Sequence, residues 1–235
     1  MEIRLIDEYN ECGHLIFCEN LPGAFLRGRT RDEALSKLAG EAESYLLWLG
    51  RKIPLCGISH LIVQEKKSGL EICDADSDVI FDSERIALSS EEYEGLKLLA
   101  LKSAADFQAL YDSIPQKDEA LWPPRNTFYG FVPRTARAMY LHTMNVNSYY
   151  FGEIGVTVKN GPDILCCRKE GFRLLEESSD FIVNPVVDGS YGEQWSLKKM
   201  LRRFLWHDRI HAKAMYRAGV GICGRSLVAD PFFFG

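Results

Sequence analysis

The sequence has no long apolar run. Its longest mainly apolar stretches, such as residues 181–187, fall well short of the ~18 residues that a membrane-spanning helix requires. The first residues, MEIRLIDEYNECG, carry no positive start followed by an apolar segment, so we expect no secretory signal. These absences favour a soluble, cytoplasmic protein that does not enter a membrane.

An excess of positive charge is also missing. The 235 residues carry 28 Lys and Arg against 33 Asp and Glu, which gives a formal net charge of -5. A surface that binds nucleic acid needs clustered basic residues to neutralise phosphates, so this composition does not favour nucleic-acid binding. The seven cysteines contain no CxxC pair, and we expect mostly reduced and buried thiols.

The first 50 residues are typical of a small αβ unit. Alternating polar and apolar residues predict strands over 2–8, 15–18 and 24–27. Thr30 is a good N-cap, and Glu33 completes a capping-box pattern for one helix that follows to about residue 49. A further strand is expected over residues 60–66.

Two motifs in this stretch carry a resemblance. They are Asn20-Leu21-Pro22-Gly23 and Thr30-Arg31-Asp32-Glu33-Ala34, a turn and the start of a helix. Residues 1–55 thereby resemble the HicB-like antitoxin domain, whose members often pair with a toxin and carry a DNA-binding tail. No such tail follows here, so the resemblance implies a module used for packing or dimerisation, which we place at residues 1–88.

From residue 89 the pattern changes to long helices. Ser89 precedes an apolar stripe that ends before Pro115, and further helices are expected over residues 135–153, 162–177 and 196–218. Gly171 is expected to interrupt the third of them. The sequence therefore predicts an α+β protein, with a small αβ module followed by a four-helix bundle at residues 89–235.

Three of the five histidines fall on the two strongest helical patterns. His207 and His211 are four residues apart, so both rings project from one face, which is also apolar. Such a pair alone is equally explained by hydrogen-bonded core histidines or by a surface pair. His142 lies on the apolar stripe of its own helix and also points inward. Three converging imidazoles leave room for water or substrate on a metal, the arrangement of a catalytic site.

These residues also resemble the DinB-like superfamily, also called DinB/YfiT-like metalloenzymes, over about residues 90–230. The family mark is one histidine on the second bundle helix and an HxxxH pair on the last. Here the last helix opens with Trp195-Ser196-Leu197 and has an Arg-rich turn before His207. The resemblance implies zinc or nickel at His142, His207 and His211, activity with low-molecular-weight thiols in some relatives, and a homodimer.

Several side chains are candidates for a supporting role. Tyr149, Tyr150 and Glu153 follow His142 and are candidates for contacting a metal ligand or transferring a proton, although they serve equally well as packing residues. Asp208 could orient a ligand histidine or pair with Arg209 or Arg202. The remaining basic residues are expected on the solvated outer face of the last helix, with an anionic partner as the second interpretation; they are Lys198, Lys199, Arg202, Arg203, Arg209 and Lys213.

Two functions follow from this sequence. The first is a divalent-metal-dependent enzyme, a thiol-dependent S-transferase or a hydrolase, with an open three-histidine site. The alternative is a non-catalytic protein in which the helices keep a structural metal and the N-terminal module recruits a partner.

Overall fold

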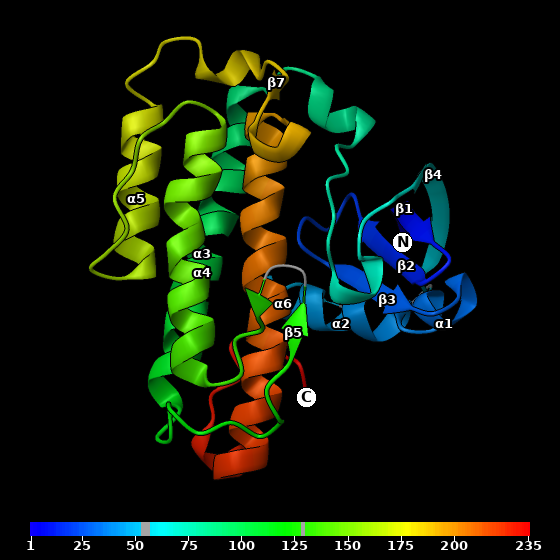
Figure 1. The fold of residues 1–235 in the computed structure, drawn as a ribbon. Coiled ribbons are helices and arrows are strands. Elements are labelled where there is room, and N and C mark those ends of the chain that lie inside the picture. Colours follow the sequence, from blue (N-terminus) through cyan, green and yellow to red (C-terminus); the bar gives the residue numbers. More distant parts are fainter. Residues whose placement is uncertain (53–56, 128–129) are drawn as a thin grey trace.

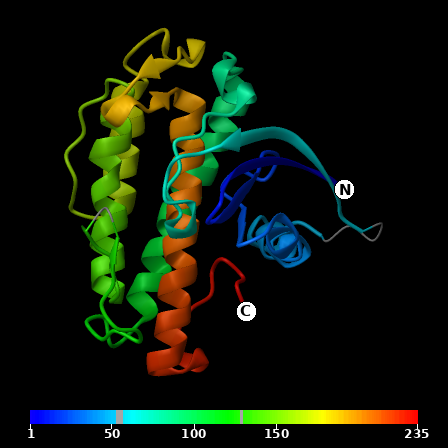
Figure 2. The same ribbon diagram turned by 45° about the vertical axis from the view of Figure 1, so that its right-hand side comes forward.

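The computed structural model describes residues 1–52, 57–127 and 130–235. A small N-terminal sheet with two short helices lies beside long C-terminal helices, so the predicted α+β class is confirmed (Figure 1). Figure 2 shows the sheet and its helices on one side of α6 and the helices α4 and α5 on the other, with α3 crossing behind α6. No helix in the described ranges has the length and apolar character needed to cross a membrane.

The N-terminal sheet has the order β3-β2-β1-β4. The strands β1 (Glu2–Asn10), β2 (Gly13–Cys18) and β3 (Phe25–Gly28) are antiparallel, and β4 (Ser59–Lys67) runs parallel to β1. A strand was expected from the sequence at each of these four places. The turn before β3 contains Gly23 at φ 94°, and a Cβ at this position would lie 2.7 Å from the Cβ of Leu205 on α6. A glycine is therefore needed in this turn, which lies directly against α6.

The single helix predicted after Thr30 is two helices in the structure. Thr30 accepts a hydrogen bond from Glu33 N at 3.1 Å and caps α1 (Arg31–Leu35) as expected. The chain then breaks before α2 (Leu38–Trp48). At the break the Ser36 hydroxyl donates to the Glu33 carbonyl at 2.8 Å. Local side-chain bonds of this kind compete with helix continuation, which the apolar periodicity does not reveal.

Four long helices make up most of the C-terminal half: α3 (Ser90–Ser113), α4 (Ala136–Glu153), α5 (Ile164–Leu175) and α6 (Leu197–Cys223). Each begins after a capping side chain that accepts a backbone N–H three residues on; the caps are Ser89, Thr135, Asp163 and Ser196. Shorter elements connect them: η1 (Ile72–Asp74), η2 (Asp82–Arg85), β5 (Asn126–Thr127), β6 (Gly130–Phe131), η3 (Phe181–Val183), β7 (Val187–Asp188), η4 (Ser190–Gly192), β8 (Gln194–Trp195) and, at the end, η5 (Arg225–Leu227).

The expected interruption of the third helix at Gly171 is wrong. The helix α5 continues through this residue, which is buried against the Phe151 ring of α4. A Cβ at residue 171 would lie 2.1 Å from Phe151 Cε2. The glycine allows two helices to approach closely and does not mark a helix end.

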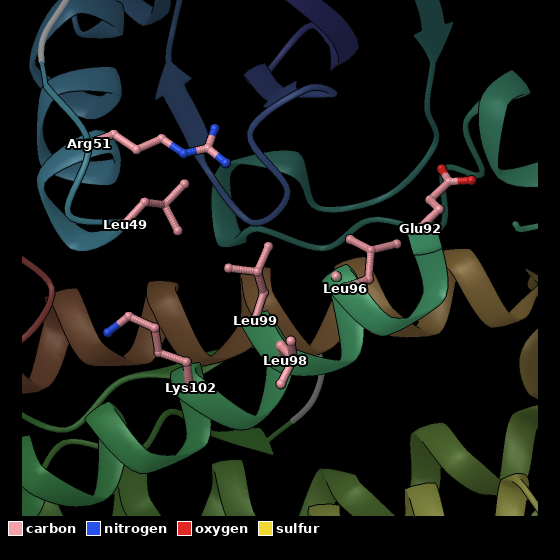
Figure 3. A pocket seen from close by; sticks show the side chains of 8 residues that line it. Leu49, Arg51, Glu92, Leu96, Leu98, Leu99 and Lys102 are labelled. Atoms are coloured by element: carbon pink, nitrogen blue, oxygen red, sulfur yellow. The ribbon is translucent and has the colours of Figure 1, made fainter. Parts of the chain in front are cut away.

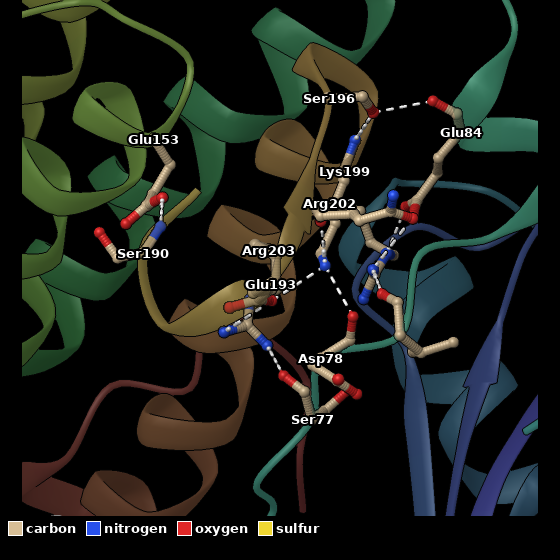
Figure 4. A network of polar contacts seen from close by, with 12 residues as sticks. Ser77, Asp78, Glu84, Glu153, Ser190, Glu193, Ser196, Lys199, Arg202 and Arg203 are labelled. Carbon is tan, nitrogen blue, oxygen red and sulfur yellow. Dashed lines mark hydrogen bonds and ion pairs between the residues drawn. The ribbon is translucent and has the colours of Figure 1, made fainter. Parts of the chain in front are cut away.

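The expected solvated basic face of α6 is also wrong. Lys199, Arg202, Arg203 and Arg209 are at most 9% exposed, because the N-terminal module and the β7–β8 segment cover this face (Figure 4). Lys198 and Lys213 are partly buried. The cations meet carboxylates and carbonyl oxygens there: Lys199 with Glu193, Arg202 with Glu84, Arg209 and Lys213 with Glu41, Lys198 with Glu92, and Arg203 with the Ser77 carbonyl.

Cysteine burial differs from the expectation as well. The six described cysteines are free thiols, as expected, but only Cys18 and Cys167 are buried. Cys12, Cys73 and Cys166 are exposed, and Cys56 lies outside the described residues. Cys12 lies in the turn between β1 and β2, Cys73 in the short helix η1 and Cys166 on the solvent-facing side of α5.

Candidate metal centre

Three histidines from two helices converge in the middle of the C-terminal half. His142 lies on α4, and His207 and His211 lie one turn apart on α6. One ligand atom from each of the three rings can be chosen so that all lie within 4.8 Å of one another. The Nε2 atoms of His142 and His207 are 3.1 Å apart. The predicted convergence of these rings is therefore present, and three histidines so placed could hold a metal ion.

The centre is buried on one side and open on the other. The His207 side chain is buried, that of His211 is partly buried, and that of His142 is exposed. Among the described residues, the clustered metal-binding side chains here are these three histidines, with no carboxylate or thiol in the group. The protein thus offers nitrogen ligands from two helices and leaves the side of His142 accessible to solvent.

Burial lowers the pKa of all three rings. The pKa of His211 falls to about 3, through burial and then through the charge of His142. The pKa of His207 is lowered well below its ordinary value by burial, by the other two histidines and by the cations Arg203 and Arg168. Burial also lowers the pKa of His142. The rings are therefore neutral near pH 7, the form in which an imidazole nitrogen can bind a metal.

His207 is not fully satisfied by the protein. Its Nδ1 atom is buried and has no hydrogen-bond partner in the described part of the chain. Leaving such a nitrogen unpaired costs ~1–3 kcal/mol, a cost that a purely structural core would normally avoid. The His211 ring packs edge-on against this ring with centroids 4.4 Å apart, and the His142 ring is tilted against it with centroids 5.0 Å apart.

Only one of the three predicted supporting residues contacts a histidine in the described structure. The Tyr150 ring lies edge-on to His207, with centroids 5.9 Å apart. Burial raises the pKa of the Tyr150 phenol, so it stays protonated and can only donate or accept a hydrogen bond near neutral pH. The Tyr149 ring packs against the rings of Tyr150 and Trp195.

Glu153 lies at the end of α4 and belongs to a different contact. Its Oε2 atom accepts a hydrogen bond from Ser190 N at 2.7 Å (Figure 4). This bond fixes the β7–β8 segment over the end of the helices. Glu153 is thus placed to anchor that segment, and no contact in the described structure joins it to the three histidines.

Asp208 has a partner that sequence reasoning missed. Both interpretations of this residue, as an orienting group for a histidine and as a partner of Arg209 or Arg202, are wrong. Asp208 forms a completely buried ion pair with Arg168 of α5. Helical periodicity does not show which residue of another helix faces a given side chain, so nothing in the sequence singled out Arg168 as its partner.

The chain matches no family model, no curated protein and no solved structure. The likeness to the HicB-like and DinB-like families therefore depends on the sequence motifs alone. The three-histidine cluster is supported by the distances between its ring nitrogens, independently of any family.

Proposed function

We propose that His142, His207 and His211 bind one divalent metal ion, zinc or nickel, and that the protein is a metal-dependent enzyme. The observation that carries the proposal is the convergence of the three ligand atoms within 4.8 Å on a partly exposed face. In this proposal α3, α4, α5 and α6 form a DinB-like four-helix bundle, and the N-terminal HicB-like module serves to pack against α6.

The donor atoms fit such an ion. Two nitrogens that share a tetrahedral zinc at ~2.0–2.1 Å lie about 3.3 Å apart. The 3.1 Å between the Nε2 atoms of His142 and His207 is close to that value. Any pair near the 4.8 Å limit needs a small side-chain rotation to share the ion, and the exposed His142 ring is free of close packing on its solvent side.

The residues present suit a reaction of bound water or of a thiol. A metal with three protein nitrogens acts as a Lewis acid that lowers the pKa of a water or thiol in its open position. Because His142 is exposed, a small substrate can reach the metal from this side. The buried Tyr150 ring packs edge-on against His207. This supports a hydrolase or a transferase that acts with a low-molecular-weight thiol.

Elemental analysis of natively purified protein tests the site. We expect about one metal ion per chain, and its loss in the separate variants His142→Ala, His207→Ala and His211→Ala. His60→Ala is the matched control, since this exposed histidine lies on β4 away from the cluster. Absence of metal after reconstitution with zinc, nickel or manganese would overturn the proposal.

Cobalt substitution separates an enzyme from a protein with a structural metal. In the open site, adding 2-mercaptoethanol or azide should change the visible spectrum of the cobalt protein, because the added anion enters the metal's coordination shell. An unchanged spectrum would show that neither ligand reaches an open position on the metal, and would favour the non-catalytic alternative.

A further inference from the structure

A groove lies between the end of α2 and the first half of α3, away from the three histidines (Figure 3). Its volume is about 520 Å³. Leucines from both helices form its apolar surface, and Leu98 is 64% exposed. The lining residues are Leu49, Arg51, Glu92, Gly95, Leu96, Leu98, Leu99 and Lys102.

The size of the groove favours a small molecule over a protein partner. Small-molecule sites in proteins usually enclose ~300–1,000 Å³, whereas a stable protein interface needs a surface of about 800 Å² on each side. The groove of about 520 Å³ falls in the first range. Gly95 contributes to this space, because a Cβ at this position would have no atom within 4 Å. The surface is thus concave where a helix would normally present a side chain.

The charges around the groove are not balanced. Lys102 donates to Asp106 at 2.7 Å, and Glu92 pairs with Lys198. Arg51 enters from the α2 side (Figure 3), and its guanidinium makes no hydrogen bond or ion pair with a side chain in the described ranges. One positive charge therefore remains at the rim of an apolar surface.

We propose that this groove binds a small amphiphilic anion, with its carboxylate at Arg51 and its aliphatic chain along Leu96, Leu98 and Leu99. The apolar lining suits an alkyl chain, and the one unmatched cation suits a single negative charge. Because Leu49 and Arg51 belong to the N-terminal module and the other residues to α3, the ligand bridges the two parts of the protein. The proposal does not depend on the metal centre.

Octanoate is the probe, followed by NMR of the leucine methyl groups in the full chain. We expect saturable shifts of the groove leucines, and affinity that rises from hexanoate to decanoate by up to roughly fourfold per methylene. Uncharged 1-octanol and the Arg51→Gln variant should each weaken binding by roughly 1.5- to fivefold, the range for an exposed ion pair.

Gly95→Leu fills the groove and should abolish octanoate binding. Leucine favours a helix more than glycine does, so this exposed substitution is not expected to unfold the chain. Gly152→Leu is the matched control, because Gly152 is also an exposed helical glycine with no atom within 4 Å of a Cβ. It should bind octanoate like the wild type.

Three results would overturn the proposal. They are shifts that do not saturate, equal binding by Gly95→Leu and the wild type, and shifts centred on leucines outside the groove. The oligomeric state of the ligand-free protein, measured by sedimentation, also tests the proposal. A dimer that Gly95→Leu dissociates, with no octanoate shifts in the wild type, would show that a second copy of the chain covers the groove instead.

Discussion

Arg168 and Asp208 form an ion pair in which neither side chain is accessible to solvent. Arg168 Nη1 donates to Asp208 Oδ2 at 2.5 Å, and Nη2 donates to Oδ1 at 3.1 Å. The other Arg168 bonds reach Asn147 Oδ1 on α4 and the Ala100 carbonyl on α3. Since Arg168 lies on α5 and Asp208 on α6, one guanidinium joins all four long helices beside His207.

Replacing Arg168 by Ala should therefore destabilise the protein strongly. The change leaves the Asp208 carboxylate buried without its partner, and we expect a loss of about 3–5 kcal/mol in the free energy of unfolding. Urea unfolding measures it. Arg173→Ala, on the same helix, is the control: Arg173 is exposed and pairs with Glu170 and Glu177, so its loss should stay below about 1 kcal/mol. Similar losses in both variants would contradict the central role of the buried pair.

The N-terminal module and the long helices should unfold together. Glu84 accepts bonds from Arg202 Nε at 2.5 Å and from Phe81 N at 2.9 Å, and residues of both parts share one apolar cluster. Calorimetry should show a single unfolding transition. The Glu84→Gln variant should lose about 1–3 kcal/mol in the free energy of unfolding, because the substitution weakens the buried contact with Arg202. Two separate transitions in the wild type would mean that the two parts are stable independently.

Local patterns predicted much of this protein correctly. Apolar patterns and turn residues indicated the four strands of the N-terminal sheet, and the capping positions Thr30 and Ser89 were visible as residue types. Helical spacing also found His142, His207 and His211 as candidate neighbours, but the expected inward position of His142 is wrong, because the structure leaves this side chain exposed. The class of fold and the residues of the candidate site were therefore accessible from the sequence.

What the sequence did not reveal are the partners of residues across elements. Arg202 and Arg209 look like solvated cations because helical spacing gives no information about a carboxylate such as Glu41, far away in the chain. Gly171 looks like a helix breaker because its contact, the Phe151 ring, belongs to another helix. Such features depend on tertiary packing, which overrides local propensity.

Gly171→Ala should destabilise the protein although alanine is the better helix former. The added methyl meets the Phe151 ring, whose nearest atoms are 2.1–2.5 Å from the ideal Cβ position. We expect a loss of about 1–3 kcal/mol from overpacking, measured by urea unfolding. Gly152→Ala, with open space around its Cβ, should instead be neutral or stabilise by up to about 1 kcal/mol. Phe151→Leu combined with Gly171→Ala should recover part of the loss, and no recovery would argue against this clash.

The metal-free protein should lose stability as pH falls through the range of histidine titration. The pKa of His211 is about 3 in the folded protein, mainly because of burial. In the unfolded chain it is about 6.5. Between these values only the unfolded chain binds a proton at this position, so acidification favours unfolding by up to about 1.4 kcal/mol per pH unit.

The test is urea unfolding of metal-free wild type and His211→Gln between about pH 7.5 and 5. The stability of the wild type should fall more steeply with acidification, because the variant lacks this titrating ring. Parallel curves would show that His211 titrates alike in both states. Saturating zinc should raise the stability of the wild type without flattening this slope, because the folded imidazoles are deprotonated with or without the metal, and should stabilise the variant less.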